Sequence, residues 1–130
     1  MKTFSHFLLI TSFLTIVTFS CNSQNTASVE GTWKCIKKET KDGNDGSNLT
    51  FTGQPYTCHV NITLLAQGNG IENNANEKFK YSLKDSILTL GNRQYIIEKL
   101  NKTTLVILEK PANKATTLSI GQMRMYLEKQ

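Results

Sequence analysis

Stretches in which apolar and polar side chains alternate run through most of this sequence and constrain its fold more than any other feature. In residues 31–38, Trp33 and Cys35 fall on the same side of the alternation. In residues 56–65, a cysteine, a valine, an isoleucine and a leucine occupy every second position. Successive side chains of a β-strand point to opposite faces, so alternation with a period of two predicts half-buried strands.

Turn signals divide the rest of the chain at short intervals. Residues 42–48 contain two Asp-Gly pairs, and Gly91-Asn92 is typical of a two-residue hairpin. The Asn- and Gly-rich residues 66–77 are expected to form a loop. Further strands are expected within residues 49–51, 78–83, 87–90, 93–100, 103–109 and 116–129.

These segments make about eight short strands joined in sequence, and no convincing helix follows the first twenty residues. We therefore expect an all-β chain that folds as a small up-and-down antiparallel β-barrel, with a small sandwich as the alternative. Closure into a barrel removes exposed sheet edges, and a barrel of this size either fills its interior or holds one small ligand.

Residues 1–20 have the layout of an export signal. Lys2 supplies a positive charge, residues 7–19 are largely apolar, and Ser20 is a small residue at the expected cleavage position. A retained transmembrane anchor is the alternative, but the apolar run is short and is interrupted by threonines and a serine.

Cys21 follows this signal directly, and the order resembles the lipobox of bacterial lipoproteins. That resemblance implies that Cys21 becomes the first residue and is acylated on sulfur, for example with palmitate. The alternative is ordinary cleavage beside Ser20, which leaves a free thiol. Residues 22–28 are small and polar and would form a flexible tether of at most about 25 Å. The predicted organisation is a signal peptide (1–20), a lipidated cysteine with its tether (21–28) and a β-barrel domain (29–130).

The chain has three cysteines, and an odd number leaves one thiol without a partner in an oxidising compartment. If Cys21 carries lipid, Cys35 and Cys58 remain, and both point inward by pattern. We expect them to form a disulfide if their strands are neighbours; two buried free thiols are the alternative.

The segment Gly31-Thr32-Trp33 resembles the Gly-x-Trp signature of lipocalins. The order of a GTW start, Cys58 and several β-strand motifs is more similar to the small lipocalin-like domain of bacterial lipoproteins, over residues 29–129. That resemblance implies a lipocalin-like barrel whose bottom is closed by Trp33, with Arg124 lying across the indole as a cation–π partner. The chain is shorter than full lipocalins and lacks their Thr-Asp-Tyr turn, which argues against a large ligand cavity.

The sequence offers little for catalysis or metal binding, so we expect no enzyme activity, no cofactor and no metal. Only His59 remains after removal of the signal, and it faces outward by alternation. The chain lacks paired Cys or His metal motifs. The residues expected to line a pocket, or else to fill the core, are Trp33, Tyr81, Tyr95, Met123 and Met125.

The charge excludes nucleic acid as the expected partner. The full chain has a net charge of +5, and without Lys2 it keeps fourteen basic and ten acidic side chains, a charge of +4. The lysines are scattered among acids rather than clustered on one segment.

Together these features predict a lipid-anchored envelope lipoprotein of a Gram-negative bacterium, facing the periplasm or the cell surface. Its lipocalin-like domain is expected to bind or sequester a small apolar ligand. The alternatives are a protein-interaction module similar to lysozyme inhibitors and a structural envelope lipoprotein without ligand.

Overall fold

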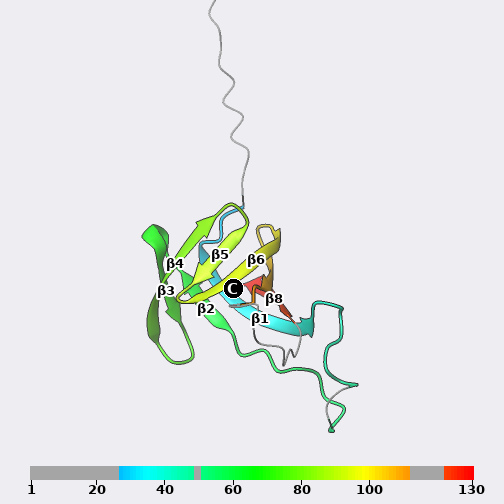
Figure 1. Cartoon of the computed structure of the whole chain (residues 1–130). Coiled ribbons are helices and arrows are strands. Elements are labelled where there is room, and N and C mark those ends of the chain that lie inside the picture. Colours follow the sequence, from blue (N-terminus) through cyan, green and yellow to red (C-terminus); the bar gives the residue numbers. More distant parts are fainter. Residues whose placement is uncertain (1–26, 49–50, 112–121) are drawn as a thin grey trace, which may run out of the picture.

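A computed structural model describes residues 27–48, 51–111 and 122–130. Cys21 and the predicted signal peptide lie outside the described residues. The described chain is a closed, entirely antiparallel barrel of eight strands in sequence order (Figure 1), which confirms the predicted fold class. The strands are β1 (Gly31–Thr40), β2 (Asn61–Leu64), β3 (Asn69–Glu72), β4 (Glu77–Lys84), β5 (Ile87–Leu90), β6 (Arg93–Leu100), β7 (Thr104–Glu109) and β8 (Met123–Lys129), with a single 3₁₀ turn, η1 (Ala66–Gly68), between β2 and β3.

The prediction of a loop over residues 66–77 was wrong, because β3 lies inside it. β3 pairs with β2 on one side and with β4 on the other. Gly70 is opposite Phe79, and a side chain at Gly70 would collide with the Phe79 ring. The glycine therefore lets the Phe79 ring lie over β3. The apolar side chain that buries this part of β3 thus belongs to β4, so the sequence of β3 itself does not alternate.

The predicted strand at residues 49–51 does not appear in the part that the structure describes. Residues 49 and 50 lie outside the described residues, and Phe51 is fully exposed in a turn. It belongs to the long connection 41–60, whose described parts extend away from the barrel beyond the end of β1 (Figure 1).

The inward faces of the strands form one core in the barrel interior. Tryptophan, leucine and isoleucine fill its centre, and its fully buried side chains are Trp33, Leu64, Leu88, Leu105, Ile107 and Leu127. Alternation identified this face correctly in β1, where Trp33 and Cys35 are both buried. Two β-bulges interrupt the alternation, one between Cys35 and Lys37 and the other between Ile97 and Lys99.

Trp33 closes one end of the barrel. Its indole N–H donates a 2.7 Å hydrogen bond to the carbonyl of Val29, which is itself buried beneath the first strand. Lys129 pairs with Trp33 across β1 and β8, and its ammonium lies 5.3 Å from the ring centroid. Gly31 has a φ of 130°, and a side chain there would collide with the Lys129 methylenes.

The predicted contact of Arg124 with Trp33 was therefore wrong. The register places Arg124 opposite Glu39, near the other end of β8, and on the outer face. Lys129 takes the position above the indole because it is the residue that the closing strand pair brings opposite Trp33.

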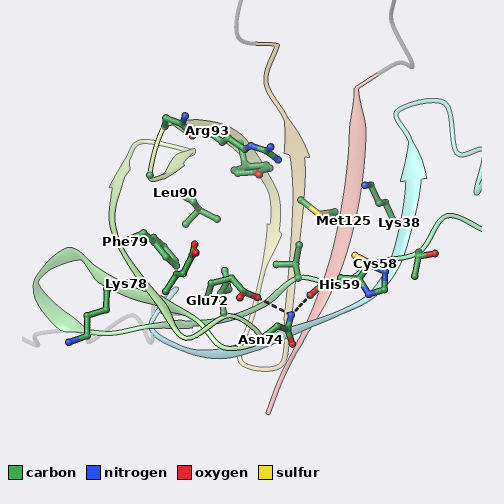
Figure 2. Close-up of a pocket in the computed structure, with 17 residues that line it drawn as sticks. Lys38, Cys58, His59, Glu72, Asn74, Lys78, Phe79, Leu90, Arg93 and Met125 are labelled. Atoms are coloured by element: carbon green, nitrogen blue, oxygen red, sulfur yellow. Dashed lines mark hydrogen bonds between the residues drawn. The ribbon is translucent and has the colours of Figure 1, made fainter.

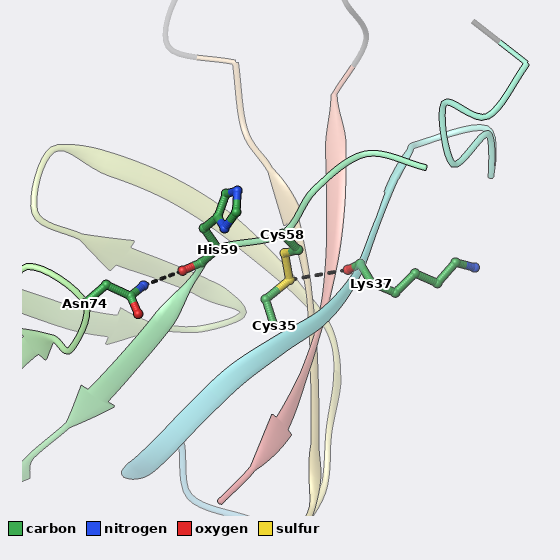
Figure 3. Close-up of a disulfide and its surroundings, with 5 residues drawn as sticks. All are labelled: Cys35, Lys37, Cys58, His59 and Asn74. Atoms are coloured by element: carbon green, nitrogen blue, oxygen red, sulfur yellow. Dashed lines mark hydrogen bonds between the residues drawn. A yellow bond between two sulfur atoms is a disulfide. The ribbon is translucent and has the colours of Figure 1, made fainter. Parts of the chain in front are cut away.

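Cys35 and Cys58 form a disulfide, with their Cα atoms 5.7 Å apart (Figure 3). The β1–β2 ladder ends at Lys34, and beyond it only the Cys35 amide still donates to the Val60 carbonyl, at 2.8 Å. The disulfide thus joins the residues just before β2 to β1, at the point where the β1–β2 hydrogen bonds end.

Replacing both Cys35 and Cys58 by serine is expected to lower the free energy of unfolding by about 3 kcal/mol, the chain-entropy value for a loop of this length. Urea unfolding followed by the fluorescence of the single, buried Trp33 measures the change. Reductant should lower the free energy of unfolding of the wild type by a similar amount and leave that of the double variant unchanged. An identical midpoint for both proteins would contradict the stabilising role of the disulfide.

Candidate ligand site at the mouth of the barrel

The end of the barrel opposite Trp33 contains a cavity of about 670 Å³ (Figure 2). The connections at this end are 41–60, the β3–β4 turn, the β5–β6 turn and the β7–β8 connection, of which residues 112–121 lie outside the described residues. Residues from seven strands, from two turns and from the segment before β2 line the cavity: Lys38, Thr57, Cys58, His59, Val60, Ile62, Glu72, Asn74, Glu77, Lys78, Phe79, Leu90, Gly91, Asn92, Arg93, Tyr95 and Met125. A site of this size fits a small organic molecule.

The deeper wall of the cavity is apolar. Phe79, Leu90 and Tyr95 come from adjacent strands, and Met125 from β8 completes the wall with Ile62. All five either belong to the core or pack against it, so their positions are fixed by the packing beneath them. An apolar group in the cavity would therefore meet a preformed surface.

The rim of the cavity is charged, and the β1 bulge places one of its cations. The extra residue between Cys35 and Lys37 reverses the alternation, so that Lys38 pairs with inward-facing Met125. Arg93 is brought to the same mouth by its pairing with Leu90. The rim also carries two acids, Glu72 and Glu77, which are opposite each other in the β3–β4 ladder.

Glu72 already has partners in the β3–β4 turn. Its carboxylate accepts a 2.9 Å hydrogen bond from the Asn74 amide and a 2.6 Å bond from the Ala75 backbone N–H. Asn74 also donates to the His59 carbonyl at 2.6 Å, which ties this turn to the segment before β2. Glu72 and Asn74 are thus part of the framework of the mouth.

Tyr95 supplies a polar atom to the wall. Burial raises the pKa of its hydroxyl, while a hydrogen bond with the Arg93 side chain acts in the opposite direction. The net pKa lies above the ordinary value of 10.0, so Tyr95 is neutral at physiological pH. It can donate or accept a hydrogen bond beside the Arg93 guanidinium.

The structure separates the five predicted pocket residues. Tyr95 and Met125 line the cavity. Trp33 lies at the closed end, and the Tyr81 hydroxyl donates a 2.6 Å hydrogen bond to the Leu65 carbonyl, next to the β2–β3 connection at that end. Met123 is buried at the start of β8 and does not line the cavity.

Sequence reasoning missed Phe79, Leu90, Lys38 and Arg93 as cavity residues. Phe79 falls on the same side of the alternation as Tyr81, so the pattern predicts that it faces inward. The pattern does not show that Phe79 lies at the open end of the barrel. Lys38 was not expected at the cavity, because the alternation of 31–38 gives no sign of a bulge. His59 is exposed as predicted, and it lies at the rim.

A second cluster of charges lies on the outer face of the barrel, away from the cavity. Glu39 is 5% exposed and contacts Lys37 at 2.7 Å, the Tyr126 hydroxyl at 2.6 Å and the Arg124 guanidinium at 3.3 Å. Arg124 also forms a bidentate pair with Glu98 and donates to the Lys41 carbonyl at 3.0 Å. This cluster joins β1, β8 and β6 over the buried outer face of β7.

The same contacts shift the protonation of the cluster. Hydrogen bonds from Lys37 and Tyr126 lower the pKa of Glu39, and the Arg124 hydrogen bond lowers the pKa of Glu98. The hydrogen bond to Glu39 raises the pKa of Tyr126. Each acid has a charged or hydroxyl partner, so the cluster has a structural role in holding the barrel closed.

The described ranges contain no group of three or more His, Cys, Asp or Glu side chains that could hold a metal ion. Within the same ranges, no helix has the length and apolar character needed to cross a bilayer.

Comparison with known proteins returned no matching family model, no matching curated protein and no matching solved structure. The class of protein is therefore defined by the barrel itself, a small eight-stranded antiparallel meander with one end closed and a cavity at the other.

Glu39→Gln is expected to lower the free energy of unfolding at pH 7 by about 1–3 kcal/mol, since it removes a charge from hydrogen-bonded partners. The pKa of Glu39 is lowered in the fold, so its contribution is present above the ordinary value of 4.5 and is lost as the pH falls below it. The difference between wild type and variant should shrink from pH 7 to pH 3 in urea unfolding. Glu128→Gln, at an exposed position, is the control. A destabilisation by Glu39→Gln that does not change with pH would contradict the stabilising role of the Glu39 carboxylate.

Proposed function

We propose that this protein is a binding module with a lipocalin-like barrel, which holds a small, largely apolar molecule in the cavity at its mouth. The observation that carries the proposal is the cavity of about 670 Å³ between core-anchored apolar side chains. A barrel with a purely structural role has no need to leave this space between Phe79, Leu90 and Met125, because filling it would add packing energy.

The proposal is for binding rather than catalysis. His59 is the only imidazole of the chain after residue 20, and it is exposed at the rim. Glu72 is engaged by the β3–β4 turn, which leaves it poorly placed as a general base. We propose no cofactor and no nucleic-acid partner.

We further propose that lipid on Cys21 anchors the protein to the cell envelope of a Gram-negative bacterium, on the periplasmic or the cell-surface side. Pairing of Cys35 with Cys58 supports this, because it leaves Cys21 as the remaining thiol of an odd set. The described chain begins at Ala27 beside the Trp33 end, so at most roughly 20 Å of extended chain separates Cys21 from that end. The mouth would then open away from the bilayer.

A protein-interaction role is the second candidate, and one observation favours it. The connection 41–60 projects beyond the mouth, and it presents the fully exposed ring of Phe51. The base of this connection is ordered by a 2.6 Å hydrogen bond from the Tyr56 N–H to the Asp45 carbonyl. A protein partner would depend on Phe51, whereas a small ligand would depend on the cavity wall.

Leu90→Trp places a larger side chain in the cavity and is expected to weaken binding of the apolar dye N-phenylnaphthylamine at least about tenfold. Ile36→Trp, on an exposed position outside the cavity, is the matched control and should bind as the wild type does. Fluorescence titration measures both affinities. Equal binding by Leu90→Trp and wild type would place the dye elsewhere and contradict the proposal.

Native mass spectrometry of the protein from its own cells, with solvent extraction, is expected to release a small molecule from the wild type and none from Leu90→Trp. Phe51→Ser should retain it. Repeated absence of any bound molecule from the wild type would favour the protein-interaction role.

Growth with labelled palmitate is expected to label the wild-type protein and the control Ser23→Ala, but not Cys21→Ser. The reason is that the thiol of Cys21 is the proposed site of acylation. The label is measured after denaturing electrophoresis. An unlabelled, freely soluble wild-type protein would contradict the anchor and leave the binding proposal unaffected.

A further inference from the structure

We propose that the ligand is an amphipathic anion, whose acidic head lies between Lys38 and Arg93 and whose apolar body lies on the deeper wall of the cavity. This inference rests on the proposed binding function and specifies the chemical class of the ligand.

Lys38 is the first reason for an anionic head. The bulge in β1 turns this side chain to the inward face, where it is half-buried beside Met125. Three ion pairs connect charged side chains within the described ranges, and Lys38 takes part in none of them. Its neighbour Lys37, by contrast, points outward and pairs with Glu39. A lysine inside a barrel mouth without such a partner is suited to an anion supplied by a ligand.

Arg93 is the second reason. It lies at the start of β6, where pairing with Leu90 brings it to the mouth. Arg93 and Tyr95 both line the cavity, and the Arg93 side chain is close enough to the Tyr95 hydroxyl to lower its pKa. A planar guanidinium beside a neutral hydroxyl can bind a carboxylate, sulfate or phosphate head.

The acids of the rim come from the β3–β4 hairpin. Figure 2 shows Lys38 and Met125 on one side of the cavity and Phe79 and Glu72 on the other. Glu72 is held by the β3–β4 turn, and Glu77 is opposite it on the same hairpin. Strands β1 and β6 thus contribute the cations Lys38 and Arg93 to the mouth, whereas β3 and β4 contribute the acids Glu72 and Glu77 together with one further cation, Lys78.

The apolar wall determines the rest of the ligand. Leu90, Phe79 and Met125 belong to the core or pack against it and offer no charged partner. A ligand that is charged throughout would have to leave water without compensation there. An acyl or aryl chain with a single acidic head satisfies both parts of the site.

The test compares three probes with the same twelve-carbon chain and different heads: dodecanoate, dodecanol and dodecylammonium. Each is titrated against the mature chain by displacement of N-phenylnaphthylamine, at constant ionic strength. Lys38→Met is expected to weaken dodecanoate binding about tenfold and to change dodecanol binding less than about twofold, because only the charged head loses a charge-assisted contact. Lys38→Arg should restore most of the affinity for dodecanoate.

Two further variants control for unspecific charge effects. Lys99→Met, on the exposed outer side of β6, removes the same charge and should leave all three affinities unchanged. Glu77→Gln should tighten dodecanoate binding about two- to threefold, because it removes a like charge from the mouth. Lyso-phosphatidic acid, used as a fourth probe, distinguishes a phosphate head of lipid origin from a carboxylate.

The outcomes separate this inference from the proposed function. Equal losses of dodecanoate and dodecanol in Lys38→Met, or tighter binding of dodecylammonium than of dodecanoate by the wild type, would overturn the anionic head while ligand binding stands. Failure of all probes and of the dye to bind the wild type would overturn the proposed function itself.

Discussion

The buried hydrogen bond between the Trp33 indole and the Val29 carbonyl defines the two ends of this barrel. It holds the segment before β1 beneath the strands and fixes the indole as the floor of the core. Lys129 covers the other face of the ring, in space that Gly31 leaves open. With one end closed in this way, the cavity lined by core-anchored apolar side chains lies at the opposite mouth, and the proposed ligand site follows from that asymmetry.

Two other features keep the mouth open and shaped. The Cys35–Cys58 disulfide replaces hydrogen bonds where the β1–β2 ladder ends, so the wall stays joined while the segment before β2 diverges towards the cavity. On the outer face, Glu39 and Arg124 connect strands that are not all neighbours. The β1 bulge serves both regions, since it turns Lys38 inward and Glu39 outward.

Much of the fold could be predicted from alternation and turn chemistry. The hairpin at Gly91-Asn92 has the predicted strands on both sides, and the inward positions of Trp33 and Cys35 are as expected. Strand β3 was missed because Gly70 contributes no side chain of its own and Phe79 of the next strand covers it. When a strand is buried by side chains of its neighbour, its own sequence shows no alternation of apolar and polar residues.

The site was less predictable, for a related reason. Alternation shows that Tyr95 and Trp33 both face inward, but it does not show which end of the barrel each one occupies. That depends on the register between distant strands, as does the choice of Lys129 rather than Arg124 above Trp33. Predicting the inward position of Lys38 would require knowing that β1 contains a bulge, because a bulge reverses which face each later residue of the strand points to.

The proposed function requires that the ligand enters by the mouth while the Trp33 end stays closed. Nuclear magnetic resonance of the ¹⁵N-labelled mature chain with a nitroxide-labelled fatty acid tests this most directly. We expect strong broadening of the Val60, Phe79 and Tyr95 amide signals and little change in the Trp33 indole signal. Broadening of the Trp33 indole and Lys129 signals that equals or exceeds that of the mouth residues would contradict it.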